Sequence, residues 1–171
     1  MKTQFEKNEI ATEKELFVKM VITAWDAQNK NVNKLLDTLS DEQLSAETAP
    51  GANRGIYLLN HLTAVSDGLL PLLSLGERLQ PQLEEIFLKN PDKSDFELPS
   101  IDELKKFWNE VNANLASHFN RMSSDEWFTK HAAVSDEDFA KEPHRNKLNV
   151  LINRTNHQSY HLGQLSLLTK K

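Results

Sequence analysis

Apolar residues recur at intervals of three and four positions in four long segments of the chain, and this periodicity limits its fold more than any other feature. Such spacing gathers apolar side chains on one face of an α-helix, whereas a half-buried strand alternates apolar and polar residues. No segment shows that alternation. The sequence therefore predicts an all-α protein.

Residue types at the ends of these segments predict where the helices begin and end. Thr12 with Glu15, and Ser100 with Glu103, match the capping box that starts a helix. Pro71 is expected to kink the second helix, because proline has no backbone N–H. The expected helices span about 12–39, 54–75, 100–123 and 146–169, with Asn53 as N-cap of the second, and the core side of the first comprises Phe17, Met20, Val21, Ala24, Val32, Leu35 and Leu39.

The length and the connections predict how these helices are organised. A chain of 171 residues is sufficient for one helical bundle domain, spanning 1–171. The connections 76–99 and 123–145 are far longer than the roughly 2–8 residues usual between bundle helices. We therefore expect a four-helix bundle in which at least one connection crosses the bundle, or covers one end and helps to wall a site.

Composition excludes several classes of function. Lys and Arg number 20 against 25 Asp and Glu, for a net charge of −5, and no basic stripe indicates a nucleic-acid partner. No stretch approaches the ~18 uninterrupted apolar residues of a membrane span, and no secretion signal begins the chain, so a cytoplasmic protein without a membrane partner is expected. Cysteine is absent, which excludes disulfides, cysteine-ligated zinc and a cysteine nucleophile.

Three histidines are expected to point into the bundle. His61 shares a helix face with apolar residues, and His157 and His161 lie four residues apart at the edge of the last helix's apolar face. Buried imidazoles need hydrogen-bond partners or must stay neutral. A metal ion that takes one nitrogen from each ring would remove this cost. Three core histidines satisfied by protein groups, without a metal, are the alternative.

The other histidines fit surface positions better. His118 lies near the apolar stripe of the third helix and is a possible ligand, but its place near the helix end also suits interaction with the helix dipole. His131 and His144 lie in a long connection, and we expect them at the surface or at the mouth of a site.

Residues near the three histidines have expected roles too. Gln164 follows His161 by three residues and can orient a ligand or a metal-bound water. Gly163 is a poor helix former, so its presence indicates close approach of another backbone or a ligand. Asp67 is expected to be a solvated helix residue rather than a general base.

The segments "LNHL" around His61 and "HQSYHLGQLSLL" near the end of the chain resemble the DinB/YfiT-like family of metal-dependent enzymes. The order of elements is similar over nearly the whole chain. The resemblance implies a four-helix bundle with long crossover connections, a homodimer, and a divalent ion such as zinc or nickel bound by His61, His157 and His161. Many members have an arginine in the motif where this chain has Leu162, so a role for that arginine is not carried over.

The expected function follows from three neutral ligands with an open fourth position. The ion would activate a water or a thiol, and family members include low-molecular-weight-thiol S-transferases and a mycothiol-dependent isomerase. We therefore expect a transferase or hydrolase acting on a small electrophile, with a thiol cosubstrate because the chain has no cysteine. No Glu-x-x-His pair supports a di-iron site. The alternative is a non-catalytic binding or stress-response module whose metal is absent or structural.

Overall fold

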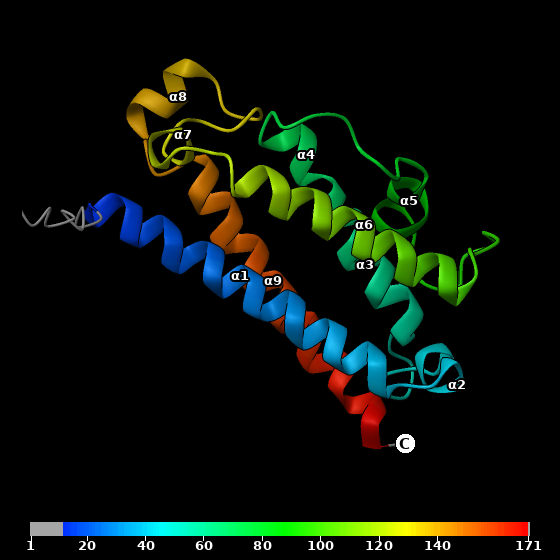
Figure 1. Ribbon diagram of the computed structural model, residues 1–171. Coiled ribbons are helices and arrows are strands. Elements are labelled where there is room, and N and C mark those ends of the chain that lie inside the picture. The colour runs from blue at the N-terminus through cyan, green and yellow to red at the C-terminus, as the bar shows by residue number, and fades with distance from the viewer. Residues whose placement is uncertain (1–11, 171) are drawn as a thin grey trace, which may run out of the picture.

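Four long helices form a bundle in the computed structural model, which describes residues 12–170 (Figure 1). They are α1 (Glu13–Thr38), α3 (Gly55–Asp67), α6 (Ile101–Phe119) and α9 (Lys147–Leu165). α1 packs along α9, and α3 packs against both α6 and α9. Residues 12–170 contain no β-strand, so the all-α bundle is confirmed.

Short helices occupy the connections between the long ones, and one more directly follows α9. They are α2 (Asp41–Ser45), α4 (Leu69–Leu72), α5 (Gln82–Glu84), the π-helix η1 (Glu85–Lys89), α7 (Ser124–Trp127), α8 (Asp136–Lys141) and the 3₁₀-helix η2 (Ser166–Lys170). α3 and α6 run in the same direction, so the chain between them returns along the bundle (Figure 1). On this path α5 and η1 pack against α3, which confirms that a long connection covers the bundle.

Both predicted capping boxes are present. Thr12 and Glu15 form one at the start of α1, and Ser100 and Glu103 form the other at the start of α6. Each satisfies backbone N–H groups that have no partner inside the helix. The hydrogen bonds from Ser100 lower the pKa of Glu103, which keeps this capping carboxylate ionised.

The start of α3 differs from the prediction. Arg54, not Asn53, is the N-cap, and its side chain makes no capping bond. Its backbone N–H instead donates to Asp92 Oδ2 at 2.7 Å. The cap therefore comes from a residue 38 positions away, which local residue patterns do not reveal.

The second predicted helix is divided into α3 and α4 at Gly68. Pro71 lies three residues after this break. Proline offers no N–H to the carbonyl four residues earlier and its ring collides with it, so Pro71 weakens the helix at Asp67. The expected disruption occurs, but as a break before the proline rather than as a kink inside a continuous helix.

The buried face of α1 is narrower than its apolar stripe, so part of its predicted core is wrong. Phe17 is 46% exposed and Met20 67%, and Ala24 is exposed as well. Trp25 is 2% exposed and packs edge-on against Phe119 of α6. The stripe that α1 buries is Val18, Val21, Trp25, Asn29, Val32 and Leu36.

Polar pairs join the long helices between the apolar clusters. Buried Gln158 of α9 donates to Asn29 of α1 at 2.8 Å, and the indole of Trp108 in α6 donates to Asn33 of α1 at 2.7 Å. These bonds fix how α1 faces its neighbours α6 and α9. None of the helices within 12–170 has the length and apolar character needed to span a membrane.

Candidate metal centre

The structure brings His61, His157 and His161 together between α3 and α9. One ring nitrogen from each lies within 4.8 Å of the others, and the three side chains are half-buried. His157 Nε2 is 3.3 Å from Nε2 of His61 and 3.1 Å from Nε2 of His161. Within residues 12–170, no carboxylate belongs to this group.

His61 is oriented by a backbone carbonyl of the connection that covers α3. Its Nδ1 lies 2.9 Å from the carbonyl oxygen of Phe87 in η1. A carbonyl only accepts, so Nδ1 carries the proton and Nε2 presents its lone pair to the other rings. Carbonyls in the last turn of a helix lack an intrahelical partner, which explains why Phe87 can accept this bond. Tyr57 stacks against the His61 ring with their centroids 6.4 Å apart.

His161 is oriented from within its own helix. Its Nδ1 lies 2.7 Å from Oε1 of Gln164, one turn later on α9. With that oxygen accepting, Nδ1 holds the proton and Nε2 again faces the centre of the group. The spacing predicted that Gln164 orients a ligand or a metal-bound water, and in the structure its side chain contacts His161.

His157 is the most perturbed of the three rings. Burial, followed by the proximity of His161, His61 and Arg154, lowers its pKa from 6.5 to about 4. Burial also lowers the pKa of His161, although its bond with Gln164 opposes that shift. Both rings are therefore neutral near pH 7, the state in which imidazole can bind a metal. His157 Nδ1 is buried and has no hydrogen-bond partner among residues 12–170.

The spacing of the nitrogens fits a shared divalent ion. Two nitrogens at the usual Zn–N distance on a tetrahedral ion lie about 3.3–3.4 Å apart. The two Nε2 separations here are 3.1 and 3.3 Å. His61 and His161 hold their protons on Nδ1, so only His157 can carry a proton on Nε2. Without an ion, the three Nε2 atoms would therefore share at most one proton. The group can therefore bind a divalent metal.

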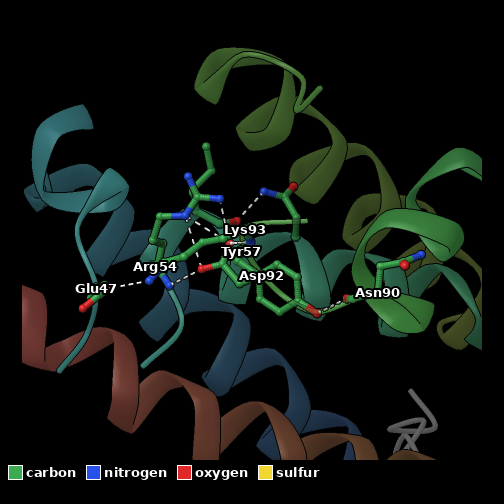
Figure 2. A network of polar contacts seen from close by, with 8 residues as sticks. Glu47, Arg54, Tyr57, Asn90, Asp92 and Lys93 are labelled. Atoms are coloured by element: carbon green, nitrogen blue, oxygen red, sulfur yellow. Dashed lines mark hydrogen bonds and ion pairs between the residues drawn. The ribbon is translucent and has the colours of Figure 1, made fainter. Parts of the chain in front are cut away.

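A network of polar contacts holds the covering connection on α3 (Figure 2). Asp92 accepts three side-chain bonds from Arg54, at 3.0 and 3.2 Å from Nε and at 2.7 Å from Nη2. Burial opposes ionisation of Asp92, but its hydrogen bonds with Arg54 hold its pKa below the usual value. Tyr57 donates to the carbonyl of Asn90 at 2.7 Å. Because Asn90 directly follows η1, these contacts position Phe87 beside His61.

The remaining histidines lie outside this group. His118 is in the last turn of α6, where its Nδ1 lies 3.5 Å from Nη2 of Arg121. His131 is half-buried, and burial followed by nearby Arg145 lowers its pKa. His144 is exposed. Of the two roles considered for His118, metal ligand and helix-end residue, its position agrees with the second.

The structure differs from the predictions for two neighbouring residues. A Cβ atom added at Gly163 would meet no atom of residues 12–170 within 4 Å, so the backbone approach expected at that glycine is not found there. Asp67 is fully buried rather than solvated, because the chain after α4 folds back over it. Its Oδ1 and Oδ2 accept from the N–H groups of Leu79 and Gln80 at 2.8 and 3.0 Å. Both oxygens are engaged, so Asp67 stabilises this turn.

Sequence reasoning missed three contributors to the surroundings of the site. Phe87 acts through its backbone, which carries no sequence signal. Tyr57 and Arg154 carry weak signals: each lies three or four residues from a histidine of the group, on the same helix face.

The comparisons with known proteins agree with this arrangement. The model of the DinB superfamily matches residues 24–165, which include the three long helices α3, α6 and α9 and most of α1. No curated protein matches the chain. Because the family match covers most of the sequence, the chain belongs to the DinB superfamily.

Proposed function

We propose that this protein is a metal-dependent enzyme in which His61, His157 and His161 hold one divalent ion. The observation that supports this proposal best is the convergence of three Nε2 atoms, two of them on rings whose Nδ1 protons are already donated. The reaction we favour is transfer of a thiol to a small electrophilic substrate, with hydrolysis of such a substrate as the second possibility.

The ion, when bound, supplies a Lewis acid that lowers the pKa of a thiol or a water. The chain supplies three neutral nitrogens, which leave room for a further ligand. The Phe87 carbonyl and Gln164 hold two rings in orientation and raise their basicity. Zinc and nickel are the ions we propose, since both suit imidazole ligands.

The absence of a suitable base favours a thiol over a water as the nucleophile. No carboxylate joins the group within residues 12–170, and both oxygens of Asp67 are engaged in hydrogen bonds. A thiol has a pKa near 8.5, so it needs a smaller shift than water to ionise near pH 7. Since the chain contains no cysteine, the thiol is a low-molecular-weight cosubstrate.

Metal analysis of the purified protein tests this proposal. We expect one zinc or nickel ion per chain after reloading, and loss of high-affinity binding in His157→Ala. His144→Ala is the matched control, because His144 is exposed and outside the group. Substoichiometric metal after reloading, or equal metal affinity in His157→Ala and the wild type, would refute the ligand set.

A second candidate is a non-catalytic helical module with a structural metal. Among residues 12–170 no carboxylate joins the three histidines, and this favours the module because a carboxylate is a common general base. Metal-dependent turnover of a generic thiol acceptor would exclude this module. A metal-loaded protein that is inert to thiols and esters, yet unfolds at a much lower temperature when stripped, would establish it.

A further inference from the structure

Arg154 of α9 is a half-buried cation that has no partner among residues 12–170. Its Nε is buried and makes no hydrogen bond within residues 12–170, and no ion pair to its guanidinium occurs there. Burial lowers its pKa from the usual arginine value. Leaving a buried polar group unpaired costs on the order of 1–3 kcal/mol, and more when it is charged. The position of this cation therefore requires an explanation.

The other arginines of the chain each contact a partner. Three of them pair with carboxylates, and the fourth lies beside a histidine ring. Arg78 is also bonded to a backbone carbonyl, that of Ala64, at 2.9 Å. The pairs are Arg54 with Asp92, Arg78 with Glu84, Arg145 with Glu142 and Arg121 with His118.

Arg154 lines a pocket of about 460 Å³, a size suited to a small organic ligand. Most of the other lining residues are apolar and come from α3, α4, η1 and the connection that follows α7. They include Ala64, Val65, Leu72, Leu88 and Ala132. Arg78 lines the pocket as well, but its charge is balanced by Glu84 at 3.1 Å.

The pocket adjoins the three-histidine group on α3 and α9, which carry the histidines, and on η1, which orients His61. Arg154 precedes His157 by three residues on α9, and Val65 follows His61 by four residues on α3. Each step is about one helical turn, or roughly 5 Å along the helix axis. Leu88 lies next to Phe87, whose carbonyl orients His61. A small ligand in the pocket therefore lies one turn from the metal centre.

A fixed positive charge at this place works against metal binding, because it repels a cation in the neighbouring group. It becomes favourable when an anion lies between the guanidinium and the ion. A guanidinium also matches a carboxylate in geometry, since its N–H groups can donate two parallel bonds.

We propose that this pocket binds the substrate or cosubstrate through a carboxylate held by Arg154, with the apolar part of the ligand against α3 and α4. A carboxylate fits better than a phosphate, because one unbalanced cation neutralises a monoanion and would leave a dianion charged among apolar side chains. The ligand class is thus a small carboxylate with an apolar body, and a thiol at its other end would reach the metal centre. That last step rests on the proposed function, whereas the anion site does not.

Direct binding tests the anion site without the metal. Hexanoate is the probe and hexanamide its neutral analogue, and calorimetry measures both on the chelator-treated full chain. We expect hexanoate to bind Arg154→Gln about 10- to 100-fold more weakly than the wild type, with Arg154→Lys between them. Arg121→Gln is the control and should bind like the wild type. Equal hexanoate binding by Arg154→Gln, equal binding of hexanoate and hexanamide, or tighter binding of inorganic phosphate would overturn the proposal.

Stability without ligand separates this role from a structural one. Because Arg154 makes no bond within residues 12–170, Arg154→Gln should unfold at the same temperature as the wild type or at a higher one. A marked loss of stability in both Arg154 variants would show that the guanidinium supports packing, and would also overturn the proposal.

A thiol probe then connects the pocket to the metal centre. In the zinc-loaded wild type, 3-mercaptopropionate should bind about 10-fold or more tightly than 3-mercapto-1-propanol, and Arg154→Gln should lose that preference. If the histidines hold no metal, adding zinc does not tighten the binding of 3-mercaptopropionate, while hexanoate binding remains. If Arg154 is no anion site, both thiols bind zinc-loaded protein equally. The two failures are therefore distinguishable.

Discussion

Gln164→Leu tests the hydrogen bond that orients His161 in the metal centre. The substitution removes the oxygen that accepts from His161 Nδ1 at 2.7 Å, together with the longer bond of 3.4 Å that Gln164 Nε2 donates to Tyr160, and keeps a side chain of similar size at this half-buried position. The Nδ1 proton is then left without its partner, and the ring is free to rotate away from the other two nitrogens. Loss of such an orienting partner weakens metal binding about 10- to 100-fold, which corresponds to about 1.4–2.7 kcal/mol.

Competition with a chelating indicator measures this change in affinity for zinc. Gln164→Glu should bind at least as tightly as the wild type, because a carboxylate accepts the same bond more strongly. Gln82→Leu, at an exposed position on α5, is the control for replacing a glutamine by leucine. If Gln164→Leu binds zinc with wild-type affinity and stoichiometry, then the observed hydrogen bond does not support the site.

Three further predictions concern pH, helix packing and assembly. The pKa of His157 is about 4 in the folded chain and 6.5 ordinarily, so between these pH values the unfolded chain binds more protons than the folded chain. The free energy of unfolding of the metal-free protein should therefore fall as the pH drops from about 6.5 to 4. The loss is about 1–2 kcal/mol after allowing for screening of a half-exposed ring, and urea denaturation should show it in the wild type but not in His157→Gln. Gly163→Ala should raise the free energy of unfolding by up to about 1 kcal/mol, because an added Cβ meets no atom of the described residues within 4 Å. A destabilised variant would indicate that another molecule covers this face. We propose that a second copy of the chain covers the exposed apolar side chains Phe17 and Met20, so light scattering should give a dimer for the wild type and a monomer for Met20→Glu, and a monomeric wild type would contradict this.

Local patterns predicted the helices well where the determinants lie close in sequence. The capping boxes of α1 and α6 each involve residues three positions apart, and both are present. The start of α3 was mispredicted because its cap is Asp92, far along the chain. The buried face of α1 was partly mispredicted because its apolar stripe is wider than the surface that α9 and α6 can cover.

The three histidines were predictable because helical periodicity placed each on an inward face. The contact that orients His61 was not predictable, because the Phe87 carbonyl belongs to a connection whose path local patterns do not define. Asp67 shows the same limit: a helical wheel reports the face of a residue but not the turn at Leu79 and Gln80 that folds back over it. Long-range backbone contacts account for both failures.

The attachment of η1 to α3 has a kinetic consequence. His61 is aligned by a short helix that lies outside the four-helix bundle and is held there by Tyr57 and the Arg54–Asp92 pair. Short covering segments open locally at a lower free-energy cost than the bundle unfolds. The dissociation rate of a bound ion should then follow the opening rate of residues 85–93, so hydrogen exchange in that segment would report how quickly the site exchanges its metal while the bundle stays folded.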